Sequence, residues 1–194
     1  MSIGDKMTIK NERKSSKFKL DRVDKRLIGE LRRNGRVSLV KLGKVIGIRH
    51  SSVRNRLLRL IKEGYIRIEA NLSLRKLGLR VAFVLMDVSD VKQVLFITER
   101  LSECPRVAMI GLTTGDYNVF MILVGKEYED IRSFIEKNLR SIRGMRKLSV
   151  SYGEIVYPDF MPLELFSRRE ECKERCASCE LLTMHACDGC MGVT

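Results

Sequence analysis

Five of the six cysteines lie close together near the end of the chain, at a spacing that could hold a metal ion. They follow the pattern C-x3-C-x2-C-x7-C-x2-C. Each C-x2-C pair turns two thiolates toward one ion, as a tetrahedral zinc site requires. We therefore expect zinc to be bound by a set of four cysteines, with one further cysteine and a histidine as alternative ligands. The four are Cys176, Cys179, Cys187 and Cys190, and the alternatives are Cys172 and His185.

Two other uses of these thiols stay open. An iron–sulfur cluster also takes about four thiolates. Disulfides are rare in a cytosol but occur in heat-adapted proteins, and the single Gln and six Asn of this chain favour such a source. Because residues 164–194 have few apolar side chains for a core, we expect one of these three links to hold the segment together. Cys104, beside Pro105, is expected to be a small buried apolar residue instead.

The positive charge of the chain is concentrated in its first 80 residues. Residues 1–80 contain 23 Lys and Arg against 7 Asp and Glu, whereas residues 81–194 contain 14 against 17. This asymmetry predicts a module that binds a polyanion, joined to a near-neutral module with another role. We expect the polyanion to be double-stranded DNA.

Other classes of protein are disfavoured. The longest apolar runs are six residues, at 81–86 and 119–124, whereas a membrane helix needs roughly 20. No apolar stretch follows the first basic residues, so we expect no signal peptide, no membrane partner and a cytoplasmic location. The chain has no nucleophile elbow, no phosphate-binding glycine loop and only two His, so we expect no enzymatic activity. A metal or redox enzyme is the less favoured alternative.

Three successive segments have apolar residues at helical spacing, after residues 1–19, which we expect to form a flexible basic arm. Asp21 is placed to cap the first helix, and Ser38 to cap the second. Gly47 separates the second helix from a third, which is expected to run from about His50 to Glu63. This order predicts a helix-turn-helix, whose third helix would enter the major groove of DNA.

The third helix has two distinct sides. Val53, Leu57, Leu60 and Ile61 gather on one side and are expected to pack on the other helices. The other side and its flanks have side chains that can contact bases or phosphates, and no acidic residue. These candidate DNA-binding residues are Ser51, Ser52, Arg54, Asn55, Arg56, Arg59 and Lys62. Leu58 lies near this exposed side, where a linker or a partner could cover it.

The pattern changes after the third helix. Residues 65–70 alternate and are expected to form a strand, and residues 71–79 a linker. From residue 80 the pattern predicts strand, helix, strand, strand, helix and strand, which is the order of a ferredoxin-like βαββαβ domain. Helices would cover one face of its sheet. The other face would need cover, so we expect symmetric dimers at least.

The segment from Leu20 to Ile66 resembles the DNA-binding domain of the Lrp/AsnC (leucine-responsive, or feast/famine) transcriptional regulators. The residues that match the family pattern are Leu20-Asp21, Asp24, Asn34-Gly35-Arg36, Ser38, Leu42, Gly47, Val53, Arg56, Leu60 and Glu63-Gly64-Tyr65-Ile66. Arg49-His50 depart from the family's usual Ser-Pro at the start of the third helix, where Ser51 is the alternative cap.

The second module resembles the effector-binding and oligomerisation domain of the same family, the RAM domain. Thr114-Gly115-Asp116-Tyr117-Asn118 stands where that family has Thr-Gly-x-Tyr-Asp, between the two middle strands. The resemblance implies that a small effector such as an amino acid binds near Gly115, Asp116, Tyr117 and Asn118, at a contact between dimers. The alternative interpretation is an ordinary hairpin turn, in which Gly115 supplies only a positive φ.

Together these observations predict an α+β protein with a defined series of parts. They are a basic arm at 1–19, a winged helix-turn-helix domain at 20–70, a linker at 71–79, a RAM-type ferredoxin-like domain at 80–163 and a Cys-rich tail at 164–194. We expect a sequence-specific transcriptional regulator that forms dimers or higher even-numbered oligomers. A small effector, and the metal or redox state of the tail, would regulate it. A DNA-binding protein with an architectural role and little sequence preference is the alternative.

Overall fold

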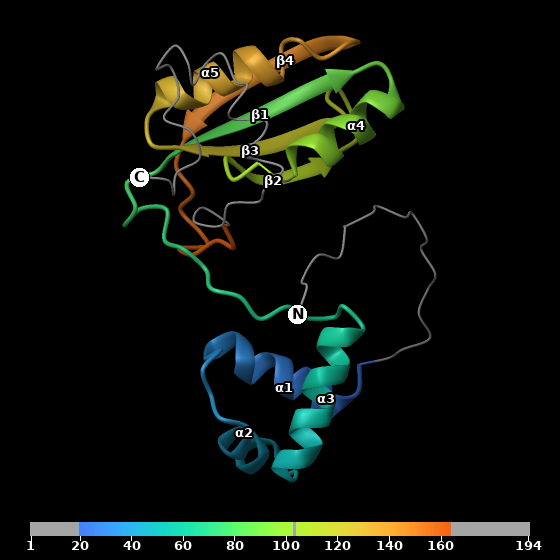
Figure 1. The fold of residues 1–194 in the computed structure, drawn as a ribbon, viewed down its shortest axis with the longest axis vertical. Helices are drawn as coiled ribbons and strands as arrows, with labels where there is room; N and C mark the ends of the chain where they lie inside the picture. The colour runs from blue at the N-terminus through green and yellow to red at the C-terminus, as the bar shows by residue number, and fades with distance from the viewer. Residues whose placement is uncertain (1–19, 103, 164–194) are drawn as a thin grey trace. The chain divides into compact units, whose positions relative to one another are not determined.

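The computed structural model describes residues 20–102 and 104–163 (Figure 1). The chain divides into two compact units, with the boundary between Ile68 and Glu69. The predicted basic arm and the Cys-rich tail, with Cys172, Cys176, Cys179, His185, Cys187 and Cys190, lie outside the described residues. No helix of the described residues is long and apolar enough to cross a membrane.

The first unit contains three helices, α1 (Arg22–Arg33), α2 (Leu39–Ile46) and α3 (His50–Lys62). The two predicted caps are confirmed. The Asp21 Oδ1 atom accepts a hydrogen bond of 2.7 Å from the Asp24 amide, and the Ser38 hydroxyl accepts one of 3.2 Å from the Lys41 amide. Gly47 has a φ of 86° and ends α2, so the turn before α3 uses the left-handed conformation that glycine tolerates.

The core of the first unit is formed by all three helices. Its buried residues are Leu27, Leu42, Ile46, Val53 and Leu60. The predicted packing side of α3 is confirmed for Val53 and Leu60, which are fully buried, and Leu57 is half-buried. The prediction was wrong for Ile61, whose side chain is 42% exposed. Ile61 lies at the edge of the apolar stripe, next to the buried Leu60.

The strand predicted over residues 65–70 is wrong, because this segment forms no strand in the structure. The amides of Tyr65 and Ile66 both donate to the Leu60 carbonyl, at 2.9 and 3.4 Å, and so terminate α3. Both side chains pack against the three-helix core, although an alternating strand would send neighbours to opposite faces. Among the described residues, this segment belongs to no β-ladder, and the described part of the unit therefore has no wing.

The second unit has the predicted βαββαβ order, which confirms its fold class. Its elements are β1 (Arg80–Val88), α4 (Val91–Leu101), β2 (Val107–Leu112), β3 (Val119–Gly125), α5 (Tyr128–Asn138) and β4 (Met145–Gly153). The strands form one antiparallel sheet in the order β2-β3-β1-β4, with α4 and α5 on one face (Figure 1). Alternate residues of β1, such as Val84 and Met86, are fully buried beneath these helices.

Part of the opposite sheet face is covered by the chain's own segments. Leu72 and Met161 exchange two main-chain hydrogen bonds of 2.7 and 2.9 Å, which tie the segment before β1 to the one after β4. Leu74, Met161 and Leu163 are buried against Val81 and Val124 of the sheet. The residues expected to be a linker, 71–79, are thus a packed part of the second unit.

The remainder of this face is apolar and accessible, and we call it the open sheet face. It contains Phe83 and Leu85 of β1, Met109 of β2 and Phe120 of β3, which alternate with residues that point toward the helices. Leu85 is 39% exposed and Met109 is 45% exposed. Two aromatic rings lie over glycines of neighbouring strands, Phe120 over Gly111 and Phe83 over Gly153. Because these glycines lack a Cβ atom, the rings can lie close to the sheet.

Candidate nucleic-acid interface

The structure places five of the seven candidate DNA-binding residues of α3 in solvent. The exposed ones are Ser51, Ser52, Arg54, Asn55 and Lys62. None of them forms a hydrogen bond or an ion pair through its side chain to another described residue, so their polar groups are available to a ligand. Two arginines of the predicted set differ from these five, because Arg56 and Arg59 are half-buried.

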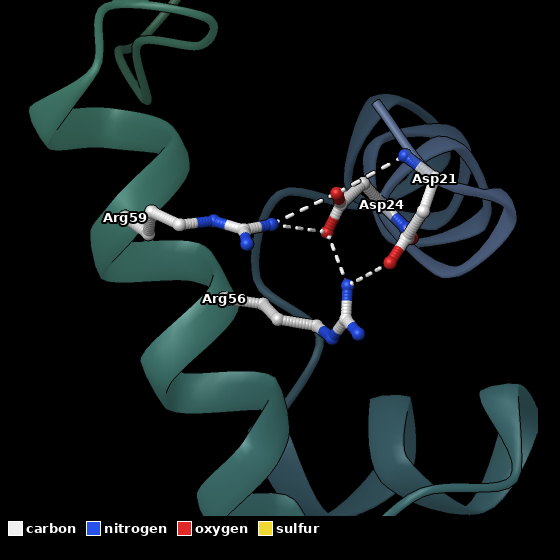
Figure 2. A network of polar contacts seen from close by, with 4 residues as sticks. All are labelled: Asp21, Asp24, Arg56 and Arg59. Carbon is white, nitrogen blue, oxygen red and sulfur yellow. Dashed lines mark hydrogen bonds and ion pairs between the residues drawn. The ribbon is translucent and has the colours of Figure 1, made fainter. Parts of the chain in front are cut away.

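Arg56 and Arg59 reach from α3 to two aspartates at the start of α1 (Figure 2). The Arg59 Nη2 atom lies 2.9 and 2.8 Å from the two carboxylate oxygens of Asp24. The Arg56 Nη1 atom donates to Asp24 at 2.8 Å and to Asp21 at 2.5 Å. Two carboxylates and two guanidinium groups thus form a network of balanced charge, which we call the aspartate–arginine network.

The same two aspartates also form the N-terminal cap of α1. The Asp24 amide donates to Asp21, and the Asp21 amide donates back to Asp24 Oδ2 at 3.3 Å, which is a capping box. The amide hydrogen bond from Asp24 and the contact with Arg56 hold the pKa of Asp21 below its ordinary value. The hydrogen bonds from Asp21 and Asp24 raise the pKa of Arg56. Arg56 and Arg59 of α3 thus supply the counterions of the two carboxylates at the start of α1.

The network changes how the charge of α3 is interpreted. Asp24 is 1% exposed, so its carboxylate is stable there only because the two arginines compensate its charge. The sequence pattern indicated unpaired basic residues along the whole face, because α3 itself has no acid before Glu63. The missed signal was Asp24, whose carboxylate serves both as a helix cap and as an ion-pair partner. DNA contacts of Arg56 and Arg59 stay a prediction.

Two further features fix the turn that precedes α3. Arg26 of α1 donates from Nη1 to the Ile46 carbonyl at 3.1 Å and from Nη2 to the Val45 carbonyl at 2.7 Å. A Cβ atom on Gly43 would lie 2.7 Å from the Ile48 carbonyl oxygen, so the turn packs directly on the α2 backbone. Sequence reasoning gave neither residue a role. Both contacts hold the turn between α2 and α3 against α1 and α2.

The N-terminus of α3 has no side-chain cap. Arg49 occupies the cap position without a side-chain hydrogen bond, and the helix begins at His50 as predicted. Ser51, the alternative cap, lies inside the helix instead. Ser51 is exposed on the first turn of α3, and the N-terminal residues of a helix that enters the major groove contact base edges.

The candidate effector turn of the second unit holds the other four predicted site residues. Gly115 has a φ of 111°, as a turn glycine was expected to have, and Gly115 and Asp116 are exposed. Tyr117 and Asn118 are half-buried. The Asn118 carboxamide accepts a hydrogen bond from the Val88 amide at 3.0 Å and donates one to the Val88 carbonyl at 2.7 Å. Asn118 therefore joins the turn to the end of β1.

The metal ligands predicted in the tail cannot be placed, since they lie outside the described residues. Within residues 20–102 and 104–163, no three His, Cys, Asp or Glu side chains are grouped so that they could hold a metal ion. Cys104 was expected to be buried; it is half-buried, and it packs against the core between the helices and the sheet.

These features define a class of protein: a helix-turn-helix DNA-binding regulator with a second domain of ferredoxin-like fold. The family model for the AsnC-type helix-turn-helix domain matches residues 20–61, and the model for the Lrp/AsnC ligand binding domain matches residues 81–152. An HTH-type transcriptional regulator of Pyrococcus horikoshii is 32% identical over 139 residues, which cover 71% of this chain and 87% of the relative. The chain belongs to the Lrp/AsnC family of transcriptional regulators.

Other relatives and solved structures agree with this assignment. The HTH-type transcriptional regulator Ptr1 of Methanocaldococcus jannaschii is 30% identical over 124 residues, covering 62% of this chain and 82% of Ptr1. The structure of Escherichia coli AsnC has a TM-score of 0.63 at 17% identity, and covers 73% of this chain and 96% of AsnC. A transcriptional regulator of Neisseria meningitidis, solved as a complex with L-Met, has a TM-score of 0.65 at 21% identity, with coverage of 76% and 97%. These two structures show the same fold.

Proposed function

We propose that this regulator reads its DNA sites in the major groove through the exposed face of α3, with Ser51, Ser52, Arg54, Asn55 and Lys62. The observation that carries this proposal is the combination of five accessible polar side chains with the aspartate–arginine network, which engages Arg56 and Arg59 on one flank of α3. An Arg side chain can form two hydrogen bonds to guanine, and an Asn side chain two to adenine. Ser and Lys side chains can contact bases or phosphates.

The experiment is a binding titration of the full chain on a duplex selected from a random library. Arg54→Ala and Asn55→Ala are each expected to weaken binding about 10-fold, and Asn55→Ala to relax the preference at one base position. Arg33→Ala removes the same type of side chain from the last turn of α1, where it pairs with Glu30, and is the matched control. Equal affinity for the selected and a shuffled duplex would instead indicate an architectural, sequence-tolerant protein.

The proposed effector is an amino acid that binds at the exposed turn of the second unit. Support comes from the match to the Lrp/AsnC ligand binding domain and from the L-Met complex of the Neisseria regulator. In this chain Gly115 and Asp116 offer an accessible main chain and a carboxylate, whereas Asn118 is engaged by Val88. A calorimetric titration with each of the standard amino acids tests this, with Asp116→Ala expected to lower the affinity of any amino acid that binds.

A homodimer, or a higher even-numbered oligomer, is proposed from the open sheet face. Phe83, Leu85, Met109 and Phe120 form an apolar surface that a second copy of the chain would cover. Light scattering on the full chain measures the assembly directly. Leu85→Asp places a charge in this face and is expected to reduce the mass of the assembly.

The tail is proposed to bind zinc through Cys176, Cys179, Cys187 and Cys190, with Cys172 or His185 able to replace a ligand. We further propose that occupancy or oxidation of this tail alters DNA affinity, because the tail follows the domain proposed to assemble. Elemental and optical analysis of anaerobically purified protein separates zinc from an iron–sulfur cluster and from disulfides. Unchanged DNA affinity and metal response after Ser replacement of the four cysteines would refute the regulatory role.

A further inference from the structure

One apolar side chain lies in the middle of the exposed face of α3. Leu58 is 55% exposed, and Asn55 and Lys62 precede and follow it along this face. Ser51, Asn55, Leu58 and Lys62 follow at spacings of four, three and four residues. Residues at these spacings share one stripe along a helix. Leu58 therefore lies between an amide and an ammonium group, one turn from each.

The surrounding contacts leave this stripe as the accessible side of α3. Val53 and Leu60 are buried in the core, and Arg56 and Arg59 are held on one flank by Asp21 and Asp24. The arrangement of Figure 2 thus removes the two arginines from the middle of the face. The accessible stripe of the helix therefore contains three side chains that form hydrogen bonds, Ser51, Asn55 and Lys62, and one apolar side chain, Leu58.

We infer that Leu58 is a specificity-determining residue, whose side chain contacts the C5-methyl group of a thymine in the major groove. This methyl group is the only apolar group on the major-groove edge of a base pair, so an apolar side chain in the groove distinguishes thymine from the other bases. Asn55 is one helical turn away and has the geometry to bind adenine. The stripe therefore selects an A·T-rich step at its centre, with Arg54 and Lys62 available to guanine or phosphate.

The size of the effect follows from the area that one methyl contact removes from water. Burial of a methylene-sized group is worth about 0.8 kcal/mol, which corresponds to roughly a fourfold change in the dissociation constant. Leu58→Ala removes the branched end of the side chain and leaves the helix intact, because Ala is the strongest helix former and the position is exposed.

The test replaces thymines of the selected duplex by deoxyuridine, one position at a time, and measures binding by the full chain. Deoxyuridine lacks only the C5-methyl group and keeps the hydrogen-bonding pattern of thymine. For the wild type, one thymine in each half-site is expected to lose about fourfold in affinity when replaced. Leu58→Ala is expected to bind the unmodified duplex about fourfold more weakly, and to be indifferent to that same replacement.

The matched control is Val45→Ala, which truncates an apolar side chain of similar exposure in α2 and should keep the wild-type response to deoxyuridine. The inference is overturned if no thymine responds, or if Leu58→Ala responds as the wild type does. A change of assembly mass without a change in the thymine response would assign Leu58 to an interface between copies of the chain, and would overturn the inference as well.

The inference rests on the proposed role of α3. That role fails only if Arg54→Ala and Asn55→Ala also bind normally.

Discussion

The carboxylate of Asp24, near the start of α1, lies 2.8 Å from the Nη2 atom of Arg59 in α3, and only 1% of Asp24 is exposed. One side chain therefore has two structural roles. It completes the capping box of α1 through its own carboxylate, and it binds two arginines of α3. Asp24 thus ties the start of α1 to α3.

Replacement of Asp24 by Asn is expected to lower the free energy of unfolding by about 2 kcal/mol, because charge-assisted hydrogen bonds are lost at a buried position. The arginines stay partly hydrated, which limits the loss. Urea unfolding of the full chain, followed by circular dichroism, measures the change. Glu63→Gln makes the same chemical change at an exposed position of the same unit, and should alter stability by less than about 0.5 kcal/mol. Equal stability of the two variants would contradict the role of the network.

The aspartate–arginine network also predicts a sensitivity to acid. The pKa of Asp21 is lowered from 3.8, mainly by the Asp24 amide and then by Arg56. A group whose pKa is lower in the folded state adds stability above its unfolded pKa, and this contribution is lost as the pH falls through its folded pKa. Stability should therefore decrease as the pH falls below about 4.

Asp21→Asn isolates this contribution to the acid response, because Asn is also a good helix cap but has no charge to titrate. The loss of stability below pH 4 should be smaller in this variant than in the wild type. Urea midpoints measured at a series of pH values make the comparison. Identical pH profiles would show that the Asp21 carboxylate has no part in acid unfolding.

Asn118→Asp restores the acid that the family usually has, yet it is expected to destabilise this chain. The Asn118 Nδ2 atom donates to the Val88 carbonyl at 2.7 Å, and an ionised carboxylate cannot donate. The expected cost at neutral pH is about 1–2 kcal/mol. The defect, relative to the wild type, should shrink at acid pH, where a protonated carboxyl group regains a donor. Thermal unfolding at two pH values checks this, with Asn71→Asp, at an exposed position, as the control.

Gly111→Ala tests the open sheet face. A Cβ atom at this position would lie 2.1 Å from Cε1 of Phe120, so the ring would have to move away from the sheet. A cost of about 1–3 kcal/mol is expected, as for other overpacked sites. Gly29→Ala adds the same atom to α1, where nothing lies within 4 Å, and should stabilise the chain instead. Truncation of Phe120 to Ala should relieve the Gly111→Ala clash. If Gly111→Ala lowers the free energy of unfolding by the same amount with and without the Phe120 ring, the ring contact is disproved.

The local features of the fold could be predicted from the sequence because neighbouring residues determine them. The Asp21 and Ser38 caps involve a side chain and an amide three residues away. The apolar periods of the second unit changed from strand to helix at the correct places, and Gly47 and Gly115 adopt the positive φ that their turns require. The helix that carries the candidate DNA-binding residues was predicted for the same reason.

Distant pairings could not be predicted in this way. Arg56 and Asp24 are 32 residues apart, and the wheel of α3 alone made Arg56 and Arg59 appear free to bind DNA. The pairing of Asn118 with Val88 spans 30 residues, and a motif comparison cannot show it. Residues 65–70 have a strand pattern, but Tyr65 and Ile66 pack on the three-helix core. In each case the partner was decided by packing, which a local pattern does not contain.

The sequence by itself determined the order of the helices and most strands, the excess of positive charge in the first unit and the helix that carries the candidate DNA-binding residues. Apolar periodicity and helix caps involve residues that are close together in the chain, and composition is read from the sequence directly. Only the tertiary structure decided which basic residues of α3 form ion pairs within the unit and which of its polar side chains are exposed. Ion pairs and close contacts depend on distances of a few ångströms between segments, and those distances exist only after α1 and α3 have packed.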